Sequence, residues 1–268
     1  MAISLDKIER EAPELLSLVK TSKINLDKHQ LTDHTARVAL VLDISGSMEE
    51  LYRSGKVDEL VKRALPLGLQ FDDDGQIDVF AFGSKAFDAG EYGLSNYKSC
   101  VKTIVKDYGL NHATYYETAL SMIEKKYKGT KLPVYVMFVT DGDTDEKAKV
   151  ERVIRSLSKQ PIFIQFIGIG TSIEPDQKGG QTSSGKKPGF LSRLFGAGSS
   201  SSSSGSRSFS GGFDFLSSLD DMDGREVDNV NFFAIKHPTS VTDERLYELL
   251  MNEYPQWLKA ARAKGILR

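Results

Sequence analysis

Short apolar runs alternate with helical patterns along most of this chain. Five apolar runs have the length and composition of buried strands, at residues 38–42, 77–82, 134–139, 162–167 and 231–234. Between them, apolar residues recur every three or four positions, as at 57–67 and 146–157, which is the spacing of amphipathic helices. Strands that alternate with helices predict a layered α/β fold with a mostly parallel central sheet.

The two ends of the chain also carry helical patterns. In the lead formed by residues 1–36, five apolar residues would share one helical face: Ile8, Ala12, Leu15, Leu16 and Val19. The opposite face mixes acidic and basic residues, whereas membrane-surface helices are rich in Lys and Arg, so we expect this helix to dock on the main domain, residues 37–268. Apolar residues between 246 and 261, including Trp257, would cover the sheet or contact the lead helix.

The composition changes abruptly at residues 171–212, which contain six consecutive serines at 199–204 and many glycines. Such a segment has too little apolar surface to offset its ordering entropy, so we expect a disordered Ser/Gly-rich insert. A basic and apolar stretch lies within it. It is either part of a tolerated insertion or a docking motif for a partner, in which four residues would form an apolar face: Phe190, Leu191, Leu194 and Phe195.

Charge and composition narrow the function classes. The 268 residues carry a formal net charge of −2, which implies no bulk attraction to nucleic acid. The single cysteine, Cys100, cannot form an internal disulfide, and we expect it to be a buried or half-buried small apolar residue. The amino terminus lacks the pattern of a secretory signal, and no stretch approaches the ~20 apolar residues of a transmembrane helix. We therefore expect a cytoplasmic protein.

Candidate chemistry follows two of the predicted strands. The first runs into Asp43-x-Ser45-x-Ser47, and the strand at 134–139 is followed by Thr140-Asp141-Gly142. In open α/β sheets, ligands collect at the carboxyl ends of strands. Spaced carboxylate and hydroxyl oxygens suit a hard cation such as Mg²⁺. The alternative, a capped helix start after a strand, explains the first motif but not the second aspartate, so the pattern predicts a metal site.

Asp43, Ser45, Ser47 and Asp141, with a threonine-bearing loop between them, resemble the metal-ion-dependent adhesion site (MIDAS) of von Willebrand factor A (vWA) domains. The resemblance implies a Rossmann-like, doubly wound sheet with helices on both faces, and a bound Mg²⁺, with Ca²⁺ or Mn²⁺ as alternatives. It also implies a threonine ligand on the intervening loop. Thr114 is the candidate, because Thr118 would lie inside the following helix, where a hydroxyl more often bonds to a backbone carbonyl.

The first motif, together with segments such as Phe213-Asp214-Phe215-Leu216 and several between 246 and 258, is similar to the bacterial tellurite-resistance and chemical-stress branch of vWA proteins. This resemblance implies a role in binding other proteins within a stress-response system. We expect a cytoplasmic adaptor without enzymatic activity, in which an acidic side chain of a partner protein supplies a missing metal ligand. The long insert departs from what we expect of that branch.

Two enzymatic readings remain as alternatives. A metal-dependent phosphotransferase or phosphatase would use Asp43 as its nucleophile, but such enzymes generally need an acidic residue two positions later, where this chain has Ser45. A serine hydrolase would need a histidine base beside Ser45 or Ser47. Neither serine lies in a G-x-S-x-G elbow, and the four histidines are better read as surface or loop residues: His29, His34, His112 and His237.

Overall fold

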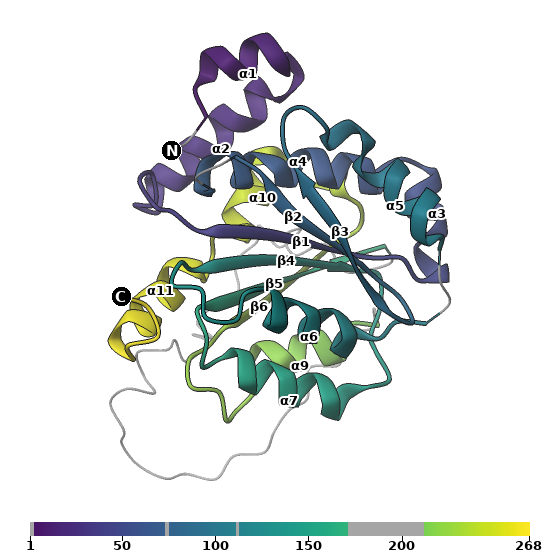
Figure 1. The fold of residues 1–268 in the computed structure, drawn as a ribbon, viewed down its shortest axis with the longest axis vertical. Coiled ribbons are helices and arrows are strands. Elements are labelled where there is room, and N and C mark those ends of the chain that lie inside the picture. Colours follow the sequence, from purple (N-terminus) through teal and green to yellow (C-terminus); the bar gives the residue numbers. More distant parts are fainter. Residues whose placement is uncertain (1–2, 73–74, 111–112, 171–211) are drawn as a thin grey trace, which may run out of the picture.

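The computed structural model describes residues 3–72, 75–110, 113–170 and 212–268, which fold around a six-stranded sheet (Figure 1). The strand order is β3-β2-β1-β4-β5-β6. The strands are β1 (Arg37–Asp43), β2 (Ile77–Phe82), β3 (Ala86–Tyr92), β4 (Val134–Thr140), β5 (Ile162–Ile169) and β6 (Val230–Ile235). Every pair is parallel except β2 with β3. The predicted mostly parallel α/β fold is confirmed, and the strand order reverses between β1 and β4.

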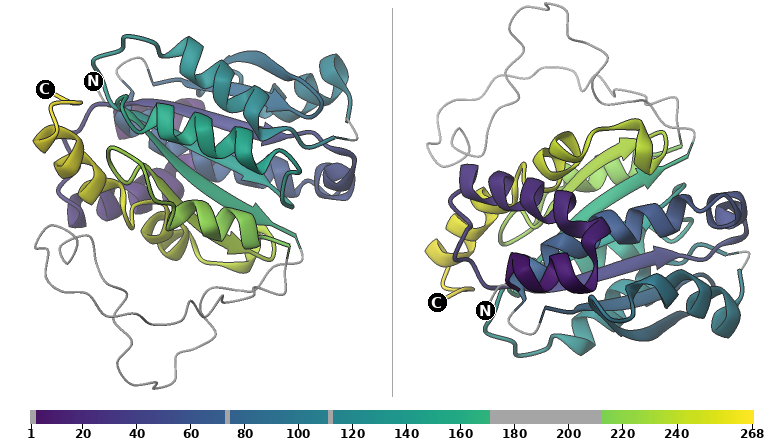
Figure 2. Two further views of the ribbon diagram at one scale, coloured as in Figure 1. Left: turned by 90° about the horizontal axis from the view of Figure 1, so that it is seen from below. Right: turned by 90° about the horizontal axis from the view of Figure 1, so that it is seen from above.

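Helices cover both faces of the sheet (Figure 2). Alternate residues of β1 point to opposite faces, so Val38, Leu40 and Leu42 enter one buried cluster while Ala39 and Val41 enter the other. The first face is covered by α1 (Leu5–Glu11), α2 (Leu16–Lys28), α4 (Lys56–Phe71), α5 (Cys100–Tyr108), α10 (Asp243–Leu250) and α11 (Tyr254–Ala263). The second face is covered by α6 (Tyr116–Lys126), α7 (Lys147–Leu157) and α9 (Asp214–Asp220). This is the doubly wound arrangement.

The amino-terminal lead is not the continuous helix that its periodicity suggested. It is divided into α1, a short 3₁₀ helix (Pro13–Leu15) and α2, with Ala12 in a non-helical conformation at φ −152° and ψ 65°. Pro13 explains the break, because proline disfavours the helical conformation of the residue before it. Ile8, Ala12, Leu15 and Val19 are nevertheless fully buried in the same cluster as the first sheet face.

The carboxyl-terminal helices complete this face. Trp257 on α11 is only 2% exposed and packs against Phe163 and Tyr254, and Cys100 is fully buried, as the sequence predicted. None of the helices in the described part of the chain combines the length and apolar character that crossing a bilayer requires. The predicted docking residues Phe190, Leu191, Leu194 and Phe195 lie outside the described residues.

Candidate metal site at the carboxyl end of the sheet

The carboxyl ends of β1 and β4 lie side by side, because the two strands pair in parallel up to Leu42 opposite Val139. Asp43 is the last residue of β1, and Asp141 directly follows β4. After β1 the chain turns through a 3₁₀ helix (Gly46–Met48), and the backbone N–H of Ser45 donates to Asp43 Oδ1 at 2.7 Å. The turn folds the hydroxyl-bearing loop back over the strand end.

A continuous chain of oxygens joins the two loops. Ser45 Oγ lies 3.1 Å from Ser47 Oγ, and the Ser47 hydroxyl donates to Asp141 Oδ1 at 2.9 Å. Neighbouring oxygens in an octahedral shell with metal–oxygen distances of about 2.0–2.1 Å are about 3 Å apart. The donor set and its spacing therefore fit a cation such as Mg²⁺. Because the Ser47 proton points to Asp141, Ser47 accepts from the Ser45 hydroxyl through one lone pair and keeps the other to bind a cation.

Thr140, the last residue of β4, holds the Asp43 carboxyl in place, a role that was not predicted from the sequence. Its hydroxyl donates to Asp43 Oδ2 at 2.6 Å, so both oxygens of the Asp43 carboxyl have protein partners. The buried hydroxyl of Tyr116, on α6, in turn contacts Thr140 Oγ1 and donates to the carbonyl of Gly142. Hydroxyls with a rotatable proton suit this role because they both donate and accept.

The electrostatics of the site favour an added positive charge. Burial raises the pKa of Asp43 to about 7, against the opposing effect of its hydrogen bonds to Thr140 and Ser45. Burial also raises the pKa of Asp141, opposed by the hydrogen bond from Ser47. Across the described residues, neither carboxylate forms an ion pair with a side chain. A cation that binds beside these two carboxylates would stabilise their charged forms, and the attraction would be stronger than in water because both groups are partly or fully desolvated.

The structure treats the two candidate threonines differently. The Thr118 hydroxyl donates to the carbonyl of Tyr115 at 2.8 Å, which is the helical back-bond expected for that residue. The carbonyl of Thr114 accepts from Thr144 Oγ1 at 2.6 Å, so Thr114 is tied to the loop after β4. Its hydroxyl makes no hydrogen bond with any of the described residues. Thr114 as a metal ligand stays a prediction.

No histidine contacts the serines in the part of the chain that the structure describes. His34 pairs with Tyr254, and His237 pairs with Thr239. His112 falls in the segment 111–112, outside the described residues. Within the described ranges there is also no cluster of three His, Cys, Asp or Glu side chains that could hold a metal, so a cation here would depend on hydroxyl oxygens as well as the two aspartates.

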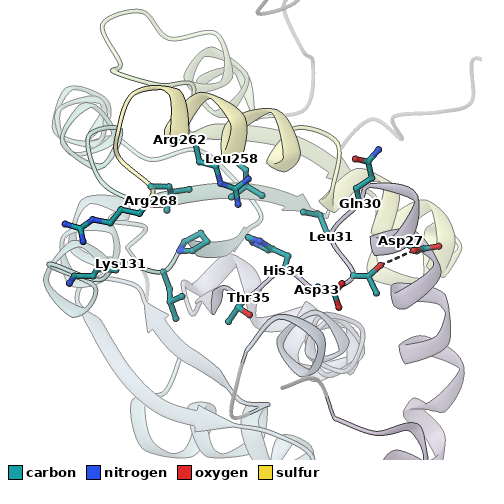
Figure 3. A pocket seen from close by; sticks show the side chains of 14 residues that line it. Asp27, Gln30, Leu31, Asp33, His34, Thr35, Lys131, Leu258, Arg262 and Arg268 are labelled. Carbon is teal, nitrogen blue, oxygen red and sulfur yellow. Dashed lines mark hydrogen bonds between the residues drawn. The ribbon is translucent and has the colours of Figure 1, made fainter.

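A cavity of about 730 Å³ lies elsewhere, between the loop 30–35, the residues before β4 and the carboxyl-terminal helix (Figure 3). His34 lies in it, and burial lowers the pKa of this imidazole to about 4. The lining residues at 27–35 and 131–133 directly precede β1 and β4, so the cavity is at the amino-terminal end of the sheet. None of the predicted site residues lines it. A metal bound by loop oxygens needs no cavity of this size.

Comparison with known proteins gives a family match over most of the chain. A family model described as vWA-TerF-like, the vWA found in the TerF C terminus, matches residues 35–173 and 205–267. The chain is also 33% identical over 260 residues to the protein named "Uncharacterized protein YcbR" of Bacillus subtilis (strain 168), an alignment that covers 93% of this chain and 88% of that protein.

Solved structures with a similar fold share little sequence with this chain. BatB from Bacteroides thetaiotaomicron is 14% identical, with a TM-score of 0.47 and coverage of 85% of this chain and 99% of that one. The manganese-loaded TRAP protein of Plasmodium vivax is 20% identical, with a TM-score of 0.42, over 51% of this chain. Proximal thread matrix protein 1 from the mussel byssus, with a zinc-occupied MIDAS motif, is 22% identical, with a TM-score of 0.38, over 52% of this chain. The match spans 58% of the TRAP chain and 36% of the mussel chain.

Proposed function

Because this chain belongs to the family of vWA domains found at the C terminus of TerF, we propose that it is an adaptor that binds a protein partner through a divalent cation, Mg²⁺ in the first place. The observation that carries the proposal is the oxygen chain Ser45–Ser47–Asp141, whose Asp141 carboxylate and the neighbouring Asp43 carboxylate have no cationic partner among the described residues. The family name leads us to propose a tellurite-resistance or stress-response system as its setting.

Each residue of the site has a separate role in this proposal. Ser45 and Ser47 offer hydroxyl oxygens to the cation, and Asp141 orients the Ser47 hydroxyl, as groups behind the direct ligands commonly do. Asp43 holds the loop through the N–H of Ser45 and supplies negative charge from its buried position at the end of β1. Thr114 is the proposed ligand from the third loop. The cation, when bound, supplies a Lewis-acidic anchor for an acidic side chain of the partner.

The buried position of Asp43 argues against the phosphotransferase alternative. Its carboxyl is fully buried, and its two oxygens accept from Ser45 N and Thr140 Oγ1. A nucleophile must reach its substrate and must exchange these hydrogen bonds for a covalent bond. A carboxylate in this position is better suited to holding a loop and a positive charge than to attacking phosphorus. We therefore propose binding, without catalysis, as the activity.

Metal titration by calorimetry tests the proposal. The wild-type protein should bind Mg²⁺, and Asp43→Ala should abolish binding while the fold, followed by circular dichroism, is kept. Thr114→Ala should weaken binding. Thr118→Ala is the matched control, because that hydroxyl is already bonded within the helix. Wild-type affinity in a folded Asp43→Ala protein would refute the site, and damage from Thr118→Ala alone would refute the assignment of Thr114.

The partner itself is sought by capture from a lysate with and without EDTA. Metal-dependent recovery of a protein supports the adaptor, whereas turnover of a small phosphorylated substrate supports the enzyme. The four apolar residues of the insert give a second prediction for the captured partner. Replacing Phe190 and Phe195 with serine should weaken association and leave metal affinity unchanged; unchanged association would remove the docking motif.

A further inference from the structure

The geometry points to Thr144 as a positioning residue that sets Thr114 against the rest of the metal site, with Tyr116 as a second support. This inference rests on the proposed function, because it concerns how the third loop of that site is held. Thr144 lies three positions after Asp141, and only 2% of it is exposed. Its hydroxyl is therefore a buried polar group, which needs hydrogen-bond partners inside the protein.

The peptide group between Thr114 and Tyr115 is held on both sides. Its carbonyl oxygen, on Thr114, accepts from Thr144 Oγ1 at 2.6 Å, and its N–H, on Tyr115, donates to the carbonyl of Gly83 at 3.1 Å. Fixing both ends of a peptide group fixes its plane. The direction in which the Thr114 side chain leaves the backbone depends on that plane, so it depends on the Thr144 hydroxyl.

Tyr116 reinforces the same connection in the opposite direction. Its hydroxyl, on the first residue of α6, donates to the carbonyl of Gly142, which lies between Asp141 and Thr144. The ring is fully buried against Phe82 and Phe138, so the hydroxyl cannot turn away without moving the helix. Two reciprocal side chain to backbone bonds thus tie the Thr114 loop to the Asp141 loop.

Thr144 also has a local role that a test must separate from this one. Its Oγ1 accepts from the backbone N–H of Glu146 at 3.3 Å, at the start of the segment that enters α7. Loss of the hydroxyl would therefore lower stability even if Thr114 bound no metal. Ser158 offers a matched control, because this fully buried serine donates to the carbonyl of Arg155 and accepts from the N–H of Glu226, each at 2.9 Å. It lies at the far end of α7.

The experiment is titration of the full chain with Mg²⁺ alone, with thermal unfolding in EDTA measured in parallel. Thr144→Val should weaken affinity roughly 10-fold, in the range seen when groups behind metal ligands are removed. Thr144→Ser keeps the hydroxyl and should restore wild-type affinity. Ser158→Ala should lower the unfolding temperature without changing affinity. In a Thr114→Ala background, Thr144→Val should have no further effect, because its target is already gone.

The outcomes separate this inference from the function beneath it. If the wild-type protein bound no Mg²⁺, the proposed function would fail and this inference with it. If the wild type bound Mg²⁺ and Thr144→Val bound it equally well, only the positioning role would be overturned. The positioning role would also be overturned if the double variant lost affinity by the product of the two single losses, since Thr114 and Thr144 would then act independently. Should Thr144→Val not fold, Tyr116→Phe is tested in its place, with weakened affinity supporting the inference and wild-type affinity overturning it.

Discussion

Replacing Asp43 with asparagine should make the metal-free protein more stable at neutral and alkaline pH. The amide has nearly the shape of the carboxyl, and it can make the same contacts. Its oxygen would accept from Ser45 N, and its NH₂ group would donate to Thr140 Oγ1. The Thr140 hydroxyl can turn to donate to the carbonyl of Gly142, 3.2 Å away. The substitution therefore removes the charge and leaves the hydrogen-bonded frame.

The size of the effect follows from the pKa of Asp43. Burial raises it from 3.8 to about 7 in the folded protein. At about 1.36 kcal/mol per pKa unit, the charged form opposes folding by on the order of 4 kcal/mol once the group is fully ionised. A raised pKa means that the stability is fully present below pH ~4 and is lost as the pH rises through ~7. Asp43→Asn should not show this loss.

Urea unfolding between pH 4 and pH 8.5 in EDTA measures the difference directly. The variant and the wild type should have similar stability near pH 4, and the variant should be the more stable of the two at pH 8. Mg²⁺ should narrow that difference, since a ligand at 100 times its Kd adds about 2.7 kcal/mol to the protein that binds it, against the opposing effect on the order of 4 kcal/mol from the charge of Asp43. Asp145→Asn, at an exposed carboxylate on the same loop, is the control and should follow the wild type.

Two results would contradict this reasoning. An Asp43→Asn protein that is less stable than the wild type at pH 8 in EDTA would show that the charged carboxyl is a net support for the fold. A stability difference that does not change with pH would show that the effect comes from packing or hydrogen bonding. After either result, the metal site could still be tested by calorimetry. The buried charge of Asp43 could no longer be given as the reason why the site favours a cation.

Two further predictions concern the frame around the site. Arg63→Met should destabilise the protein by about 2–4 kcal/mol in urea unfolding, because the buried guanidinium bonds to the carbonyls of Pro238 and Val241 and pairs with Asp243; unchanged stability would mean that these contacts contribute little. Gly168→Ala should cost about 1–3 kcal/mol, since the new Cβ would lie 2.9 Å from the Phe213 ring; a neutral effect would mean that the ring can shift freely.

The sequence predicted five of the six strands and missed β3, one of the two edge strands. β1, β2, β4, β5 and β6 were each expected from continuous apolar runs, which is typical of parallel strands buried on both faces. β3 was not expected, because most of its residues are half-buried or exposed and because it includes Gly90 and two acidic residues. It pairs antiparallel with β2 across a register shift, so its conformation is set by its neighbour more than by its own composition.

The candidate site was predictable to the extent that its residues follow strands directly. Asp43 and Asp141 could be placed together, because parallel strands end at the same edge of a sheet. Thr144 and Tyr116 could not, since their partners are backbone carbonyls 30 and 26 positions away, and a carbonyl has no signature in the sequence. Hydrogen bonds from a side chain to the backbone of another loop can be identified only when the structure of both loops is known.

The treatment of buried acids elsewhere in the molecule supports a functional reason for Asp43. Asp72 is 4% exposed and pairs with Arg37, and Asp78 is 9% exposed and pairs with Lys126. Asp43 is fully buried and has no cationic partner among the described residues. Burying an uncompensated charge is expensive, and proteins keep such groups chiefly where function requires them. A bound cation would supply the missing countercharge, so we expect the stability of this fold to depend on metal in a way that the paired aspartates would not.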